Sequence, residues 1–300
     1  MRLRDEEKNL KLGERRESAR KQQKMQDRGK IIVINIAVAL VIVMIALTVK
    51  AVVLDKNTKQ QKSEDNKKVV EATDAPSTTP APSSTPEPVG ADRWIRKDLD
   101  STKPMVALTF DDGPYAKVTR RILKSLQENG GRATFFVVGN RIETYAETMK
   151  LAYDQGNQIG SHTFDHSDLR TMSVKQLKKE IKKTNKAVSA VIGCDTTALR
   201  PPYGNVNKKM RKTIPVPMIY WSLDSEDWKS RDAKSVIKQC KSVKDGEIIL
   251  MHDLYPSTAE AVESIVPKLV KSGYQLVTID ELFYYKGIQA KGGKVYYSGR

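Results

Sequence analysis

The chain has 300 residues, and its 52 Lys and Arg against 36 Asp and Glu give a formal net charge of +16 at pH 7. A hydrophobic content of 39% is enough for a core and excludes a wholly disordered chain. Two cysteines exclude a disulfide-dense mini-protein and a four-thiolate zinc site, and the sequence leaves open whether Cys194 and Cys240 form one bridge or stay free.

The first 54 residues predict a membrane anchor. Residues 1–30 carry eleven basic and six acidic side chains without a hydrophobic period, so we expect a solvated, cytoplasmic basic arm. Residues 31–54 contain a nineteen-residue apolar run, Ile31 to Val49, which at ~1.5 Å per residue nearly spans a ~30 Å hydrocarbon core. We expect one transmembrane helix rather than a cleaved signal peptide, because signal peptides have apolar regions of only ~7–15 residues.

Residues 55–92 predict a spacer. The stretch PSTTPAPSSTPEP, from Pro76 to Pro88, has the composition of an extended, semi-rigid linker. Basic residues are nearly balanced on the two sides of the span, so the charge bias alone does not orient it. Because Ser/Thr/Pro-rich stalks are commoner outside cells, we expect a single-pass protein of the cell membrane with the following domain extracellular.

Residues 93–286 predict one α/β domain. The sequence favours strands at 105–110, 132–138, 216–222 and 247–252, and helices at 174–191 and 259–271. Ser173-x-x-Gln176 and Ser257-x-x-Glu260 have the pattern of a helix capping box. Alternating strands and helices indicate a parallel sheet, open or closed into a barrel. Residues 287–300 are rich in Gly and Lys, and we expect them to form a peripheral tail or one short ribbon.

Polar clusters follow the predicted strands, where parallel α/β folds place their active sites. Asp111 and Asp112 end the first strand, and since neighbouring side chains of an extended segment point to opposite sides, the two carboxylates could have different tasks. His162 and His166 present two imidazoles at i, i+4 spacing. With Asp112 they would form a two-histidine, one-carboxylate metal site that leaves positions open for water and substrate. Each motif alone is equally compatible with a structural turn or a structural histidine pair.

Three further clusters lie at later strand ends: Arg200-Pro-Pro-Tyr203-Gly, Asp224-Ser-Glu-Asp227-Trp228 and Leu250-Met-His252. Taken singly, they are typical of an ordinary turn with a surface arginine, a solvated acidic loop and a packed core histidine. All three histidines of the chain, however, lie in the clusters at predicted strand ends. This coincidence favours one shared site.

Taken together and in order, TFDDGP, HTFDH, RPPYG, DSEDW and LMH resemble the five motifs of the polysaccharide deacetylases, carbohydrate esterases that remove N- or O-acetyl groups from glycans. The resemblance covers about residues 95–285. It implies a distorted (β/α) barrel with about seven strands. It also implies that Asp112, His162 and His166 hold one divalent metal ion, with zinc expected and cobalt or manganese as alternatives.

The resemblance also implies roles for the other residues. Asp111 would be the catalytic base and His252 the general acid, with Arg200 paired to the base and Asp227 tuning the acid. The Tyr203 N–H would face the oxyanion, Trp228 would line the substrate groove, and Leu250 would border the pocket for the acetyl methyl group.

Anchor, spacer and family together predict hydrolysis of the N-acetyl group of N-acetylglucosamine in cell-wall peptidoglycan. The alternatives are N-acetylmuramic acid, a chitin-like or poly-N-acetylglucosamine chain, acetylated xylan, or a catalytically silent glycan-binding module. The net charge alone would suit nucleic acid, but no stripe of basic residues interleaved with aromatics is present. We therefore expect a wall glycan and the membrane as partners, and no nucleic acid.

Overall fold

The computed structural model describes residues 95–300, which belong to one compact unit of the chain. The predicted basic arm, membrane span and spacer lie outside these residues. Within residues 95–300, no helix combines the length and the apolar character needed to cross a bilayer.

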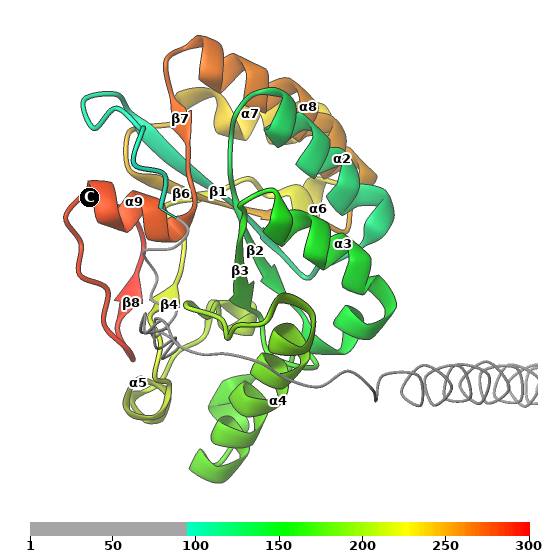
Figure 1. Ribbon diagram of the computed structural model, residues 1–300, viewed down its shortest axis with the longest axis vertical. Coiled ribbons are helices and arrows are strands. Elements are labelled where there is room, and N and C mark those ends of the chain that lie inside the picture. The colour runs from blue at the N-terminus through cyan, green and yellow to red at the C-terminus, as the bar shows by residue number, and fades with distance from the viewer. Residues whose placement is uncertain (1–94) are drawn as a thin grey trace, which may run out of the picture. The chain divides into compact units, whose positions relative to one another are not determined.

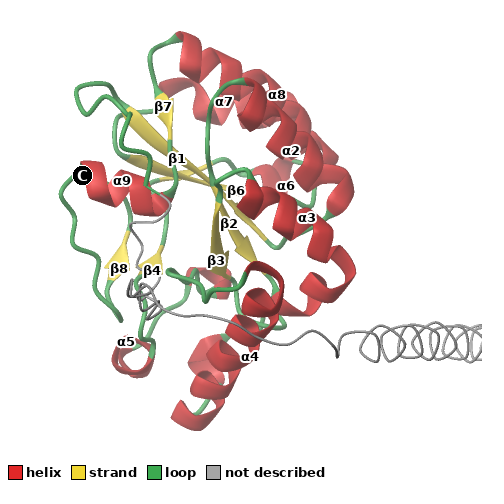
Figure 2. Ribbon diagram, in the orientation of Figure 1, coloured by secondary structure: helices red, strands yellow, loops and turns green. Residues whose placement is uncertain are grey.

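The described chain alternates strands and helices (Figures 1 and 2). The strands are β1 (Met105–Asp111), β2 (Thr134–Val137), β3 (Gln158–Ser161), β4 (Met218–Ile219), β5 (Leu223–Asp224), β6 (Glu247–His252), β7 (Gln275–Leu276) and β8 (Val295–Tyr296). The helices are α2 (Ala116–Glu128), α3 (Ile142–Asp154), α4 (Val174–Ile192), α5 (Lys208–Thr213), α6 (Asp227–Ser230), α7 (Ala233–Gln239), α8 (Pro256–Lys271) and α9 (Ile279–Tyr285).

The predicted parallel sheet is confirmed. The strands are ordered β3-β2-β1-β6-β5, β7 pairs with the start of β1, and all of these pairings are parallel. Leu199 forms parallel bridges to Ser161 and to Met218, which link β3 to the β4-β8 pair. Because β4 leads directly into β5 beside β6, the strands curl into a distorted barrel. Eight strands replace the seven or so expected, and four of them have only two residues.

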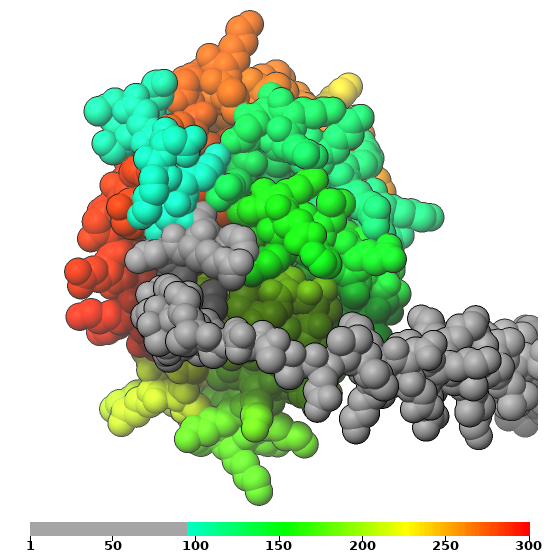
Figure 3. All heavy atoms as spheres, viewed as in Figure 1, coloured from blue at the N-terminus to red at the C-terminus, as the bar shows by residue number. Residues whose placement is uncertain are grey.

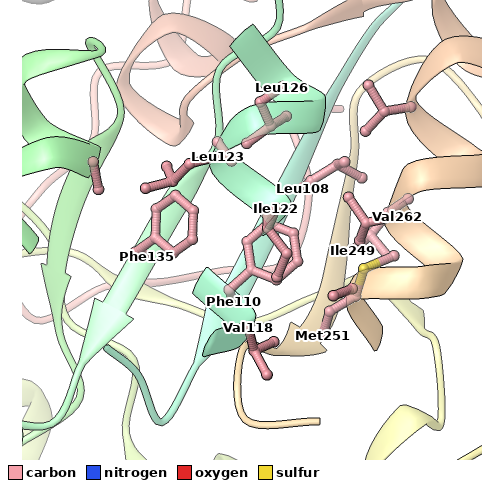
Figure 4. Packing of buried hydrophobic residues seen from close by; sticks show 14 of the residues in the cluster. Leu108, Phe110, Val118, Ile122, Leu123, Leu126, Phe135, Ile249, Met251 and Val262 are labelled. Carbon is pink, nitrogen blue, oxygen red and sulfur yellow. The ribbon is translucent and has the colours of Figure 1, made fainter. Parts of the chain in front are cut away.

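Burial on both faces explains the continuous apolar runs in the strand sequences. All seven residues of β1 are buried, as expected for a parallel strand covered on both faces. Phe110 and Phe135 stack with ring centroids 5.1 Å apart, and α2 and α8 press Ile122 and Val262 into the same cluster (Figure 4). Burial of each such side chain stabilises the fold by roughly 1.5–3 kcal/mol.

The two predicted capping boxes have different outcomes. Ser173 caps α4 as predicted, since its hydroxyl accepts from the Gln176 N–H and the Gln176 side chain accepts from the Ser173 N–H. The prediction at Ser257 is wrong, because α8 begins one residue earlier, at Pro256. Proline suits the first helical position, so Ser257 lies inside the first turn instead of capping it.

The C-terminal residues pack against the domain through one short strand. Strand β8 pairs with β4, and the Tyr296 ring lies 5.2 Å from that of Phe283. Gly292 and Gly293 pass so close to the backbone of residues 211 and 215 that a Cβ at either glycine would clash. The tail forms one edge of the surface (red in Figure 3).

Both cysteines are free thiols, which settles the question that the sequence leaves open. Cys240 is buried, and this burial, with the nearby charges of Asp227 and Glu247, raises the pKa of its thiol to about 12. Cys194 is partly exposed, with its sulfur 3.3 Å from the Tyr153 hydroxyl.

Candidate active site at the carboxyl ends of the strands

The five polar clusters converge on one cavity of about 400 Å³. Eight of the ten residues predicted for the site line it: Asp111, Asp112, His162, His166, Tyr203, Trp228, Leu250 and His252. The remaining two, Arg200 and Asp227, are fully buried and bond to lining residues. The structure therefore brings together every residue that the motifs single out.

One wall of the cavity carries a metal-binding arrangement. The Asp112 Oδ1 atom lies 3.5 Å from His162 Nε2 and 3.3 Å from His166 Nε2, and one ligand atom from each residue falls within 4.8 Å of the others. Asp112 Oδ1 is buried without a hydrogen-bond partner, a costly state unless a cation joins it. His162 Nδ1 lies 2.7 Å from the Arg200 carbonyl oxygen. Since a carbonyl only accepts, Nδ1 must donate, which leaves the Nε2 lone pair for a metal.

The backbone at this wall adopts conformations that side chains rarely take. Asp112, Thr163, His166, Tyr203 and Glu226 all have positive φ, between 53° and 71°. Such strain clusters where a fold holds functional groups in place. It also corrects the expectation that Asp111 and Asp112 face opposite sides. The left-handed turn at Asp112 directs its carboxylate to the same side, so that His162 Nε2 lies 3.7 Å from one aspartate and 3.5 Å from the other.

Arg200 forms a buried ion pair with Asp111. The Arg200 Nη1 donates to Asp111 Oδ1 at 2.8 Å and to Thr109 Oγ1 at 2.7 Å, while its remaining nitrogens donate to the carbonyls of residues 219 and 220. The guanidinium lies 4.3 Å above the centre of the Phe136 ring. Burial lowers the pKa of Arg200, and the charge of Asp111 opposes that effect. The alternative of a surface arginine on an ordinary turn is therefore wrong.

The opposite wall carries His252, which is bonded to Asp227. His252 Nδ1 lies 2.8 Å from Asp227 Oδ1, and the other oxygen accepts from the His252 N–H and the Thr258 hydroxyl, each at 2.7 Å. Burial by itself lowers the pKa of His252. The hydrogen bond and charge of Asp227, together with the charges of Asp111 and Asp112, outweigh burial and raise this pKa to about 9.

His166 shows the reverse balance. Burial lowers its pKa, and the neighbouring His162 lowers it further, against the opposing charges of Asp112 and Asp111. A neutral imidazole is the form that binds a metal ion.

Tyr203 and Trp228 present exposed rings at the mouth of the cavity. The Tyr203 side chain is 65% exposed and meets the His166 ring edge-on at 4.8 Å, while Trp228 is 46% exposed. Leu250 is almost completely buried and offers the cavity a small apolar surface. Exposed aromatic rings beside a polar cavity suit the apolar face of a sugar.

Three residues of the site lie outside the five motifs, and Thr109, the first residue of TFDDGP, makes a contact that the motif does not predict. Trp221 and Tyr255 line the cavity, Thr109 bonds to Arg200, and Thr258 bonds to Asp227. The aromatic pair Tyr220-Trp221, at the end of the predicted strand 216–222, is a signal for Trp221. Thr109 and Thr258 gave none, because a threonine inside a strand or helix pattern does not reveal what its hydroxyl meets.

Comparison with known proteins identifies the family. A model of the polysaccharide deacetylase family matches residues 98–215. A peptidoglycan-N-acetylglucosamine deacetylase of Bacillus cereus is 31% identical over 202 residues, which are 64% of this chain and 94% of that protein. The chain belongs to the polysaccharide deacetylase family. The family model covers the segments TFDDGP, HTFDH and RPPYG.

Two longer relatives are more similar in sequence. The peptidoglycan-N-acetylglucosamine deacetylase PgdA of Listeria monocytogenes is 42% identical over 197 residues, covering 65% of this chain and 42% of PgdA. The peptidoglycan-N-acetylmuramic acid deacetylase PdaC of Bacillus subtilis is 40% identical over 185 residues, covering 61% of this chain and 40% of PdaC. The chain thus matches less than half the length of these two relatives.

Solved structures agree with the fold. A deacetylase described as T48, solved with substrate, superposes with a TM-score of 0.63 at 41% identity, covering 66% of this chain and 99% of that one. A family 4 acetyl xylan esterase from Clostridium thermocellum, solved with a cobalt ion, gives a TM-score of 0.61 at 34% identity, covering 65% and 98% of the two chains. A divalent metal in this family's site fits the Asp112, His162 and His166 arrangement.

Proposed function

We propose that this protein hydrolyses the N-acetyl group of N-acetylglucosamine in peptidoglycan, using a bound divalent metal ion. The observation that carries the proposal is the complete constellation in one cavity. A buried carboxylate with an arginine partner lies between the three metal-ligating side chains and a histidine with a raised pKa. Nothing in this set is replaced by an inert residue, which argues against a catalytically silent glycan-binding module.

Asp112, His162 and His166 would hold the metal, which when bound acts as a Lewis acid toward water and the acetyl carbonyl. Asp111 takes the proton from the attacking water. The Arg200 bond to Oδ1 fixes the orientation of this carboxylate and leaves Oδ2 directed toward the histidines. A positioned base of this kind contributes about 10²–10⁴ in rate.

His252 gives its proton to the departing sugar amine. An amine is a poor leaving group until it is protonated, so an amide requires an acid here. The Asp227 carboxylate keeps His252 protonated at neutral pH and fixes Nδ1 as the bonded nitrogen, so that Nε2 is the atom left to face the cavity. The Tyr203 N–H is proposed to stabilise the oxyanion, and Leu250 to contact the acetyl methyl group.

Zinc is the proposed metal, because two imidazoles and one carboxylate with open positions form the usual ligand set of catalytic zinc. Cobalt and manganese accept the same ligands. The relatives' names divide between two sugars, N-acetylglucosamine for PgdA and N-acetylmuramic acid for PdaC. We propose N-acetylglucosamine, which is also named for the Bacillus cereus relative that this chain nearly covers end to end.

The described chain begins away from the cavity. Arg96 donates to both Glu281 oxygens and to the carbonyls of residues 130 and 276. These groups lie near the starts of β1 and β2, whereas the cavity lies at the strands' carboxyl ends. We propose that residues 31–54 anchor the protein in the cell membrane and that residues 55–92 carry the domain outward.

Mass spectrometry of enzymatically digested wall fragments tests the proposed substrate. Wild-type protein should remove one acetyl group per disaccharide, and fragmentation should place the loss on N-acetylglucosamine. The variant Asp111→Asn serves as the matched control and should leave the fragments acetylated. Loss from N-acetylmuramic acid would assign the other sugar, and intact fragments that still bind the protein would support the silent module.

A further inference from the structure

The C-terminal tail contributes an exposed aromatic ring beside the segment that follows β4. Strand β8 pairs with β4, and Tyr297 follows β8 at the point where the chain crosses to Glu247, with which Ser298 forms an antiparallel bridge. Its side chain is 54% exposed. The ring meets Tyr220 edge-on, with centroids 4.9 Å apart and planes at 73°.

Tyr220 connects Tyr297 to the cavity. Its ring stacks on Trp221 with centroids 5.5 Å apart, and its hydroxyl donates to the Gly204 carbonyl oxygen. Trp221 and Gly204 both line the cavity, and the Trp221 ring lies so close to Gly204 that a Cβ there would be only 3.0 Å away. Tyr297, Tyr220 and Trp221 therefore form a continuous aromatic ridge from the cavity wall to the tail.

We propose that Tyr297 is a sugar-stacking platform for a glycan unit next to the one that reacts. This inference rests on the proposed function. The substrate is a polymer, so neighbouring units must lie on the surface around the cavity. Single exposed aromatic rings are ordinary on protein surfaces, but a ring continuous with the cavity wall offers a sugar an apolar face where the chain would leave the site.

Tyr284 provides a matched comparison. Like Tyr297, it is exposed (48%), contacts another aromatic ring, that of Tyr285, and does not itself line the cavity, but its ring is covered by the Lys97 ammonium group at 3.9 Å. A general effect of removing a surface tyrosine should appear equally at both positions, whereas a glycan contact should appear only at Tyr297.

The test compares N-acetylglucosamine oligomers of two and six units. In Tyr297→Ala, the ratio of kcat/KM for the long oligomer to that for the short one should fall about three- to tenfold, mainly through KM. Tyr297→Phe keeps the ring and should retain the wild-type ratio, as should Tyr284→Ala. An unchanged ratio would overturn the platform. If kcat/KM fell equally for both oligomers, Tyr297 would only support Tyr220 and the turn beyond it.

Calorimetric titration of the same oligomers separates this proposal from the proposed function, because binding does not require turnover. Wild-type protein should bind the six-unit oligomer more tightly than the two-unit one, and Tyr297→Ala should lose that difference. If no acetate is released but the difference and its loss are observed, the deacetylase proposal fails while the platform stands. If the two oligomers bind wild-type protein equally, the platform is wrong.

Discussion

Each wall of the cavity carries histidine, but the histidines of the two walls have different roles. The group that contacts Nδ1 of the ring determines which role each has. At the metal wall, His162 Nδ1 meets the carbonyl oxygen of Arg200, a neutral acceptor. At the opposite wall, His252 Nδ1 meets the carboxylate of Asp227, which carries a full negative charge. A neutral partner leaves an imidazole that can ligate a metal, and a charged partner favours an imidazolium that can give up a proton.

The pKa shifts follow the same division. Burial and a second imidazole lower the pKa of His166, whereas the charge of Asp227 outweighs burial and raises that of His252 to about 9. The comparison teaches that motif spacing selects the histidines, while the partner of each ring determines its chemistry. Variants on each wall should therefore fail in different ways.

The largest effect is expected from His162→Ala at the metal wall. Loss of a direct ligand should weaken zinc affinity by more than about 100-fold, because loss of a residue that only hydrogen-bonds to a ligand already costs about 10–100-fold. Acetate release should become undetectable at matched zinc concentration. Metal content after dialysis, measured by mass spectrometry, checks the affinity. Asp165→Asn lies in the same loop but is exposed, and should bind zinc as the wild type does.

Asp111→Asn should lower kcat/KM by about 10²–10⁴ on both an acetamide and an activated acetyl ester, because each needs a base for the attacking water. Zinc content should stay within a few-fold of wild type, since the three ligands remain. If Asp111→Asn lost zinc to the same extent as His162→Ala, Asp111 would be a metal ligand and not only the base.

His252→Gln should separate the two substrates. The acetamide should lose about 10²–10⁴ in kcat/KM, while an ester with a good leaving group should lose much less, because its leaving group departs without a proton. Steady-state assays on both substrates check this. Equal losses would mean that His252 does not act as the acid for the leaving group.

Asp227→Asn should lower kcat/KM at neutral pH less than the other variants do. Its clearest effect should be on the pH dependence of kcat/KM. Without the carboxylate charge, burial dominates and the pKa of His252 falls. The protonated acid is lost as pH rises through that pKa, so the alkaline limb of kcat/KM should move to lower pH. Asp232→Asn, an exposed aspartate at the start of α7, is the control and should leave the limb in place.

The same pair has a consequence for stability. The folded protein binds the His252 proton more tightly than the unfolded chain, so its contribution to the free energy of unfolding is complete below the ordinary pKa of 6.5 and is lost as pH rises through about 9. Urea unfolding at pH 6 and pH 9 should show this loss in wild type and a smaller loss in Asp227→Asn. A larger loss in the variant would contradict the assignment.

The sequence predicts much of this site because the chemistry sits in contiguous motifs at strand ends. The parallel sheet and the grouping of the three histidines both follow from that pattern. Other features depend on contacts distant in sequence. The burial of Arg200 requires carbonyls from β4 and its flank, and the Thr258 bond requires α8 to pack beside Asp227. The convergence of Asp111 and Asp112 needed the positive φ at Asp112, which no periodicity predicts.

The C-terminal tail shows the same limit. Its Gly- and Lys-rich composition is typical of a peripheral segment, yet the glycines are there because residues 211 and 215 pass too close for a side chain. Composition does not reveal that these glycines allow two backbone segments to approach closely.

Acetate release from purified peptidoglycan by protein stripped of metal and then supplied with zinc tests the central claim most directly. The stripped protein should release almost no acetate, added zinc should restore release, and His162→Ala should stay inactive at the same zinc concentration. Wild-type protein that releases no acetate with zinc, cobalt or manganese, while still binding the glycan, would contradict the claim.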